Sequence, residues 1–227
     1  MSSARKSGRP ATPIDRATLT AIAARHFAER GYAGASLSEI ADDAGLRKAS
    51  LYHHFPTKDA LYVAVLDTAV AELRALVLAA GLASGDFAAA LDRLGALIID
   101  YFAGHPYVAR LLTHEMLGAG EYVRGPGLAA IAANLGATAA FLEAGMRAGV
   151  FRRQDPRHLA LTIVGLHVFY FATPVTSGAF LEDDIFAPAL VRARRAEVLA
   201  HVRALCLAPV AAAPPRRAAR AGVRSKR

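Results

Sequence analysis

The sequence predicts an all-α protein, and three observations support this fold class. Alanine is abundant and runs of β-branched residues are few, which favours helices over sheet. Apolar residues recur at helical spacing along most of the chain. No repeat of fixed period is present. A length of 227 residues suits one large domain, or a small domain fused to a larger one.

The first helix is expected from about Ile14 to Arg30, and its apolar face carries Leu19, Ile22, Ala23 and Phe27. Gly31 follows as a C-terminal stop that accepts a left-handed backbone. His26 lies beside the apolar face, where a packed histidine with a polar tip is the favoured interpretation over a functional group.

Two short helices follow around a tight turn. Ser36 and Glu39 fit a capping box, in which each side chain satisfies a free backbone donor near the other, and this helix is expected to end at Gly45. The next helix is expected from about Arg47 to His54, before Pro56. Thr57 can then cap a long helix that begins at Lys58.

The remaining chain predicts a larger helical body. Its helices are expected at about 58–80, 86–104, 106–118, 127–148, 156–173 and 187–207. Asp155-Pro156 is a good cap and first-turn pair. From Leu159 to Leu181 there is no Asp, Glu, Lys or Arg, but Pro174 is expected to end the helix after about 15 apolar residues, or about 22 Å. A hydrocarbon core needs about 30 Å, so we expect a buried or interface helix and no membrane partner.

The net charge of +8 belongs to the two ends of the chain. The tail from Ala208 carries six basic residues and no acid, and the arm before residue 13 carries three basic residues, which leaves −1 for the body. We therefore expect a disordered basic arm (1–12), two folded segments (13–60 and 61–207) and a disordered basic tail (208–227). Both ends have two interpretations: solvated segments, or auxiliary clamps on phosphate.

Cys206 is the single cysteine, so no internal disulfide can form, and no cluster at zinc spacing accompanies it. The N-terminus lacks the pattern of a signal peptide. These features favour a cytoplasmic protein without a metal site or cofactor. The adjacent His53 and His54 point about 100° apart on a helix, which disfavours a shared metal ion.

The second short helix has the pattern of a DNA-recognition helix. At 100° per residue, Leu51 and Phe55 face the core, whereas Ala49 and His53 point away. Its outward side is small and polar, and Arg47 and Lys48 stand at its N-terminus. Such a helix can enter a major groove. An ordinary helical hairpin with two exposed basic residues is the competing interpretation.

The order of the whole run favours DNA binding. Gly31-Tyr32, then Ser36-Leu37-Ser38-Glu39-Ile40-Ala41, Ala44-Gly45-Leu46, Leu51-Tyr52-His53-His54-Phe55 and Lys58-Asp59-Ala60-Leu61 resemble the TetR family of bacterial transcriptional regulators. The resemblance covers roughly residues 15–62. It implies that residues 13–60 form a three-helix helix-turn-helix DNA-binding domain and residues 61–207 a divergent helical ligand-binding and dimerisation domain. It also implies a homodimer built through the last two helices, and repression relieved by a small molecule.

Carried over by position, the resemblance implies DNA contacts through Ser36, Lys48, Ala49, Ser50, Tyr52, His53, His54 and Lys58, to which the spacing adds Arg47. Two departures are mild: Ala49 stands where glycine is common, and His26 where the family usually has an apolar residue.

Polar residues within the apolar helices of the body are candidates for a pocket. The candidate ligand-binding residues are Tyr101, His114, Asn134, Thr138, His167 and Tyr170, although each alone is more often a hydrogen-bonded core group. No Ser/His/Asp order, carboxylate pair or phosphate-cradling glycine loop is present, so we do not expect an enzyme.

The leading hypothesis is a homodimeric, sequence-specific repressor that binds double-stranded operator DNA and is released by an unidentified small-molecule effector. The alternative is a non-specific architectural DNA-binding protein that acts through its basic ends.

Overall fold

The computed structural model describes residues 14–80, 85–119, 121–125 and 127–208. These residues form helices joined by short connections, with one isolated bridge between Phe151 and Leu207. The all-α prediction is confirmed. The helices are α1 (Arg16–Gly34), α2 (Leu37–Asp43), α3 (Lys48–His54), α4 (Lys58–Ala79), α5 (Phe87–Gly104), α6 (Val108–His114), the π-helix η1 (Glu115–Ala119), α7 (Glu121–Arg124), α8 (Gly127–Arg147), α9 (Pro156–Ala172), α10 (Pro174–Leu181) and α11 (Pro188–Cys206).

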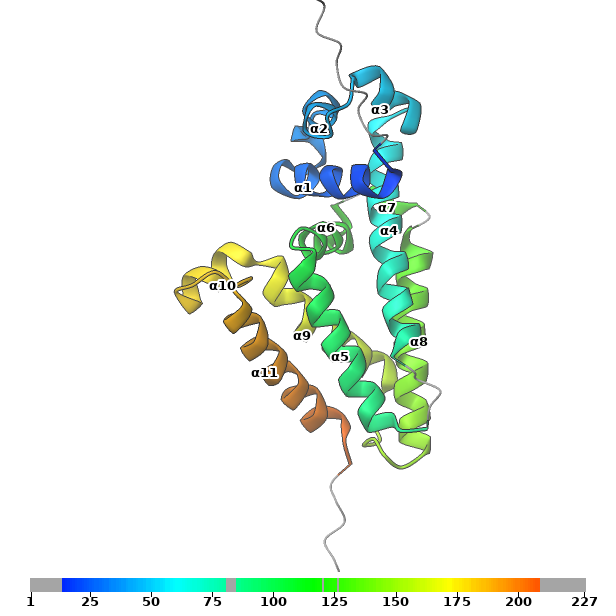
Figure 1. Ribbon diagram of the computed structural model, residues 1–227. Helices are drawn as coiled ribbons and strands as arrows, with labels where there is room; N and C mark the ends of the chain where they lie inside the picture. The colour runs from blue at the N-terminus through cyan, green and yellow to red at the C-terminus, as the bar shows by residue number, and fades with distance from the viewer. Residues whose placement is uncertain (1–13, 81–84, 120, 126, 209–227) are drawn as a thin grey trace, which may run out of the picture.

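Helices α1, α2 and α3 form a three-helix unit at one end of the molecule, and α4 runs from this unit along the body (Figure 1). In the body, α5 packs against α11, and α8 packs against both α9 and α4. The boundary predicted between residues 60 and 61 falls within α4, so one continuous helix belongs to both parts. The expected disordered ends lie outside the described residues, except that the Ala208 N–H donates to the Val150 carbonyl over 3.0 Å.

Side chains cap several helices where the sequence predicts them. Thr57 Oγ1 accepts a hydrogen bond from the Ala60 N–H at 3.0 Å, and Asp155 Oδ1 accepts from Arg157 N–H at 2.8 Å. Both bonds satisfy free donors of a first turn. The first helix starts slightly later than expected, at Arg16, because Asp15 Oδ1 accepts from the Thr18 N–H at 2.7 Å.

Two glycines shape the three-helix unit. Gly31 has φ of +69° and Gly45 has φ of +64°, in the range that L side chains rarely adopt. The expected end of the first helix at Arg30 is only partly right, because the chain kinks at Gly31 and helical structure continues to Gly34. Gly45 ends the second helix as predicted.

The sequence does not reveal three features of the body. The helix expected at 106–118 is shorter, since an α-helix gives way to a π-helix at Glu115, and α7 follows as a separate short turn. Pro174 does end α9, but it also begins α10, which is bent by 80° from α9.

Of the described helices, α8 is long and apolar enough to cross a membrane by length and composition, and the bent pair α9 and α10 passes the same test only together. The core helix of a soluble protein also passes this test.

Candidate DNA-binding face and internal cavity

Helix α3 is held on the three-helix unit by its apolar face. Leu51 is 0% exposed and Phe55 is 1% exposed, and both belong to the same core as Leu19, Phe27 and Ile40. The prediction that Leu51 and Phe55 face inward is confirmed. The turn before α3 is tight, because the Leu46 N–H donates to the Ala41 carbonyl over 2.8 Å.

The opposite side of α3 is open to solvent. Six of the predicted DNA-binding residues are exposed there: Arg47, Lys48, Ala49, Ser50, Tyr52 and His53. The other three, Ser36, His54 and Lys58, are half-buried around this face. A short helix with a small polar surface and a basic N-terminus has the shape and charge needed to enter a major groove.

The predicted capping box is absent. The Ser36 side chain makes no cap hydrogen bond, and the Glu39 carboxylate pairs with Arg30 of α1 instead. The guanidinium of Arg30 lies within reach of Glu39 in the folded unit, and it offers the carboxylate a full opposite charge where the backbone N–H offers only a dipole. Ser36 therefore keeps a free hydroxyl beside the outward face.

Lys58 links the start of α4 to the end of α1. Its Nζ donates to the Ala33 carbonyl over 3.2 Å and lies 4.7 Å from the centroid of the Tyr32 ring. The Tyr32 hydroxyl in turn donates to Asp59, and burial together with this carboxylate raises the pKa of Tyr32 to about 12. A phosphate contact by Lys58 stays a prediction, and the ammonium has further N–H donors for it besides the one used on the Ala33 carbonyl.

His26 is a packed histidine with a polar tip, the favoured interpretation of this position. Its Nε2 lies 2.7 Å from Asp43 Oδ2, which also accepts from Arg25 over 2.7 Å. The hydrogen bond from His26 and the guanidinium of Arg25 lower the pKa of Asp43, with desolvation opposing them. This contact fastens the end of α2 to α1.

Sequence reasoning missed one basic residue near the end of α3. The Arg16 guanidinium lies 4.3 Å from the centroid of the Phe55 ring, a cation–π contact between α1 and the residue after α3. Arg16 is exposed and adds a positive charge to this side of the unit. No local pattern could reveal it, because the two residues are far apart in the sequence.

Two polar contacts join the three-helix unit and α4 to the body. The Tyr62 hydroxyl on α4 donates to the carboxylate of Glu115, which is 0% exposed, over 2.5 Å. The second oxygen of Glu115 accepts from the Val123 N–H at 3.3 Å. Arg110 on α6 donates to the Ala28 carbonyl on α1. The start of η1 is thus bound to the helix that carries the DNA-binding unit.

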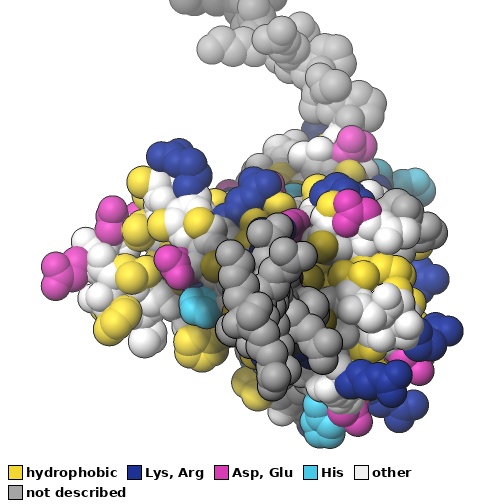
Figure 2. Space-filling view, turned by 90° about the horizontal axis from the view of Figure 1, so that it is seen from below, with side chains coloured by type: hydrophobic (Ala, Val, Ile, Leu, Met, Phe, Trp, Pro, Cys, Tyr) yellow, Lys and Arg dark blue, Asp and Glu magenta, His cyan; other side chains and the backbone are white. Residues whose placement is uncertain are grey.

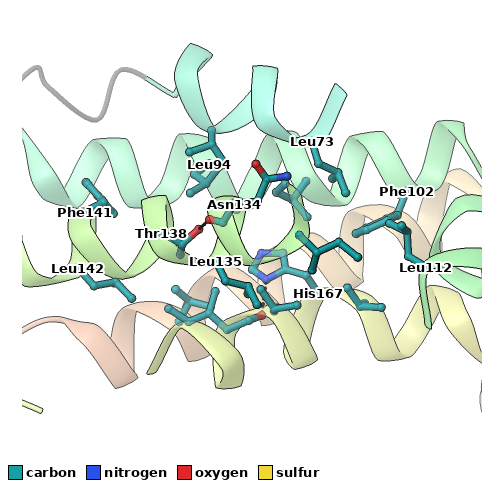
Figure 3. A pocket seen from close by; sticks show the side chains of 18 of the residues that line it. Leu73, Leu94, Phe102, Leu112, Asn134, Leu135, Thr138, Phe141, Leu142 and His167 are labelled. Atoms are coloured by element: carbon teal, nitrogen blue, oxygen red, sulfur yellow. Dashed lines mark hydrogen bonds between the residues drawn. The ribbon is translucent and has the colours of Figure 1, made fainter. Parts of the chain in front are cut away.

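The body contains a partly open cavity of about 130 Å³ between α4, α5, α6, α8, α9 and α11 (Figure 3). Its walls are almost entirely apolar, and the described residues that line it include no Asp, Glu, Lys or Arg. The lining residues labelled in Figure 3 are Leu73, Leu94, Phe102, Leu112, Asn134, Leu135, Thr138, Phe141, Leu142 and His167. An apolar pocket with a few polar groups is the usual form of a small-molecule site.

The structure divides the six predicted ligand-binding residues into two groups. Asn134, Thr138 and His167 line the cavity. Asn134 Nδ2 donates to the Val70 carbonyl over 3.1 Å, and Thr138 Oγ1 donates to the Asn134 carbonyl over 3.1 Å. His167 is 4% exposed, and burial lowers its pKa more than the Ile163 and Gly95 carbonyls raise it, while the charge of Arg194 lowers it further.

The other three residues, Tyr101, His114 and Tyr170, do not line this cavity, and their role in ligand binding stays a prediction. The Tyr101 hydroxyl donates to Glu72 over 2.7 Å, and the Tyr170 hydroxyl donates to the Ile185 carbonyl over 3.1 Å. His114 is exposed. Tyr101 and Tyr170 behave as hydrogen-bonded core groups, because a buried hydroxyl needs a partner wherever it points.

Among the described residues, no three His, Cys, Asp or Glu side chains come together in a way that could hold a metal ion. His53 and His54 have ring centroids 6.3 Å apart at an interplanar angle of 71°.

Comparison with known proteins identifies the chain. Residues 19–65 match the family described as "Bacterial regulatory proteins, tetR family", and residues 88–202 match the domain described as "Tetracyclin repressor-like, C-terminal domain". The chain belongs to the TetR family. The resemblance drawn from residues 15–62 is therefore confirmed, and the TetR match extends into the body.

The TetR assignment is supported by curated relatives. The chain is 31% identical over 170 residues to the HTH-type transcriptional regulator RutR of Escherichia coli (strain K12), covering 70% of this chain and 77% of RutR. It is 29% identical over 186 residues to the HTH-type transcriptional repressor NicS of Pseudomonas putida (strain KT2440), covering 80% and 88%. This TetR protein is a DNA-binding transcriptional regulator and not an enzyme.

A solved structure shares the TetR fold. AibR, crystallised "in complex with isovaleryl coenzyme A and operator DNA", superimposes with a TM-score of 0.64 and 19% identity, covering 82% of this chain and 96% of AibR. At this identity the likeness concerns the fold alone.

Proposed function

We propose that this protein is a homodimeric repressor that binds a palindromic operator through α3 and releases it when a small molecule occupies the cavity. One observation carries the DNA-binding part of the proposal. Leu51 and Phe55 are buried, whereas Lys48, Ala49 and Tyr52 are exposed on the opposite side of α3. Ala49 lets the backbone of α3 approach base edges closely, and Lys48 supplies charge for phosphate.

The surfaces of α9 and α11 support a homodimer. On α9, Leu161 is 53% exposed and Phe169 is 67% exposed, with the exposed Gly165 between them at helical spacing. On α11 an exposed stripe of alanines runs along the helix: Ala189, Ala193, Ala196, Ala200 and Ala204. Small residues allow close helix packing, and apolar area of this kind is usually covered by a partner. Figure 2 shows further hydrophobic side chains on the left of the view, the side on which Figure 1 has α10.

The cavity supports control by a ligand. It is lined by residues of α4, including Leu73 and Val77, and by Leu112 and Met116 of α6 and η1. The same two segments contact the three-helix unit, so a ligand that prefers one arrangement of them also changes the placement of α3. NicS is named a repressor, and the AibR structure holds both a ligand and operator DNA.

Selection of DNA sequences bound by the full chain tests the proposal. We expect a palindrome with half-sites one helical turn apart, about 34 Å. Lys48→Ala and Tyr52→Ala should abolish the selected footprint, whereas Arg74→Ala, which removes an exposed positive charge on α4, should leave it intact. Retained sequence preference in both α3 variants would contradict the assigned surface.

Two further measurements test the homodimer and the role of the basic tail. Phe169→Glu should convert a dimer into a monomer in light scattering, because a buried unpaired carboxylate is costly at an apolar interface. Removal of residues 209–227 should keep the operator preference. A loss of all DNA binding on that truncation would favour the architectural alternative.

A further inference from the structure

An unpartnered nitrogen belongs to a side chain that lines the cavity from α9. His167 Nε2 is buried and has no hydrogen-bond partner among the described residues. The other ring nitrogen, Nδ1, lies 2.8 Å from the Ile163 carbonyl one turn earlier. A carbonyl oxygen can only accept, so the 2.8 Å contact assigns the proton of the neutral ring to Nδ1. The Gly95 carbonyl also lies near the ring, but Nε2 makes no hydrogen bond to it, so Nε2 presents a lone pair.

The space beside this nitrogen depends on Gly95. A Cβ placed on Gly95 would lie 3.3 Å from His167 Nε2 and 2.6 Å from Leu199. A side chain at position 95 would therefore crowd the buried Nε2, and glycine leaves this approach from α5 free of a Cβ. An unpaired acceptor buried among apolar residues is unfavourable, and a ligand donor would recover this cost.

The other polar groups of the cavity also accept more than they donate. The Thr138 hydroxyl hydrogen is used on the Asn134 carbonyl, which leaves the oxygen lone pairs (Figure 3). Asn134 uses one amide hydrogen on the Val70 carbonyl and keeps its Oδ1 and one further hydrogen. A ligand with acceptor atoms alone could bond only to the remaining amide hydrogen of Asn134, and His167 Nε2 would stay unpaired.

The size of the cavity and the lack of charged lining residues limit the class of ligand further. The cavity of about 130 Å³ is close to the roughly 150 Å³ in which an apolar cavity takes up benzene. No Lys or Arg is among the described residues that line it, so a carboxylate or phosphate would lose its hydration without a counter-charge.

We infer that the cavity selects a small, uncharged and mainly apolar molecule whose hydroxyl group donates a hydrogen bond to His167 Nε2, which means an alcohol or a phenol of about one ring. This inference rests on the proposed function, in which the same cavity is the effector site.

Calorimetric titration of the full chain with four one-ring probes tests the inference. Phenol carries a donor, anisole carries only an acceptor, toluene carries neither, and benzoate carries a charge. We expect phenol to bind at least about tenfold more tightly than anisole or toluene, the effect of one buried hydrogen bond. Equal affinities for phenol and toluene, or benzoate as the tightest probe, would overturn the inference without any variant.

His167→Phe assigns the effect to one atom. The substitution keeps a ring of similar size and removes the acceptor. The affinity for phenol should therefore decrease about tenfold, while the affinity for toluene changes less than about threefold. His158→Phe, at an exposed position of the same helix, is the matched control and should keep the preference. A preference for phenol that survives in His167→Phe would overturn the role of Nε2.

Binding of the selected operator by the ligand-free wild type is measured on the same preparations. If the protein binds the operator but shows no preference for phenol, the inferred ligand class is wrong and the proposed function as a DNA-binding regulator still stands. Phenol binding that never changes operator affinity leaves the selection by His167 intact and overturns the effector role of the cavity.

Discussion

Replacing Tyr62 with phenylalanine removes a single hydroxyl from the contact between α4 and η1. Glu115 is 0% exposed, and its carboxylate receives one hydrogen bond from Tyr62 and one from the Val123 N–H. The substitution leaves one carboxylate oxygen buried without its donor. Hydrogen bonds to charged groups contribute about 1.5–3 kcal/mol, so we expect Tyr62→Phe to lower the free energy of unfolding by about 2 kcal/mol.

The assay is urea unfolding followed by far-UV circular dichroism, with Tm from calorimetry at one fixed protein concentration. A loss of about 2 kcal/mol corresponds to a decrease in Tm of about 4–8 °C for a chain of this size. Tyr107→Phe is the matched control, because this tyrosine is half-buried and its hydroxyl has no partner among the described residues. We expect the control to change stability by less than about 0.5 kcal/mol.

The same substitution made in a Glu115→Gln variant isolates the contribution of the Glu115 charge. In Glu115→Gln the acceptor is neutral, and the loss of the Tyr62 hydroxyl should cost only about 1 kcal/mol. The reasoning is refuted if Tyr62→Phe costs no more than Tyr107→Phe, or if its cost is unchanged in the Glu115→Gln background.

Three further outcomes are expected. Gly145→Ala would place a Cβ 2.2 Å from the buried Phe151 ring and should destabilise the protein by about 1–3 kcal/mol, whereas Gly136→Ala on the same helix meets nothing within 4 Å and should stabilise it by about 0.5–1 kcal/mol; urea unfolding compares the two. The pKa of His167 is lowered in the folded state, so the unfolded chain gains a proton first as pH falls below about 6.5, and wild-type stability should decrease more between pH 7.5 and 5.5 than that of His167→Phe. Cys206 is 0% exposed and burial raises its pKa to about 11, so a thiol reagent at pH 8 should modify it only after unfolding, and rapid modification of the native protein would argue against this packing.

Local patterns in the sequence predicted local structure well. The positions of Leu51 and Phe55 follow from helical periodicity, and the stop at Gly45 and the cap at Thr57 follow from backbone chemistry within a few residues. Each depends on neighbours in the chain. The kink at Gly31 shows the limit, because a positive φ interrupts a helix but does not determine the backbone conformation of the next residues.

Contacts between segments that are distant in the sequence could not be predicted from these local patterns. Glu39 stands at the right spacing for a capping box, but Arg30 on another helix takes its carboxylate. Helical spacing gives the angle between Tyr101 and Phe102, yet only the tertiary structure decides that Phe102 lines the cavity and Tyr101 does not. The same reason separates the three lining polar residues from the three outside.

Helix α4 connects the cavity rigidly to the three-helix unit. Val77 lines the cavity near one end, and Tyr62 meets the three-helix unit about 22 Å away at 1.5 Å per residue. A tilt of about 5° at the cavity would move the far end by about 2 Å over that length. In a symmetric dimer the two α4 helices would change the separation of the α3 helices by about 4 Å, slightly more than the roughly 3.4 Å rise between base pairs. In the proposed dimer, a displacement of a few atoms inside the body would thereby produce a mismatch of about one base step along the DNA.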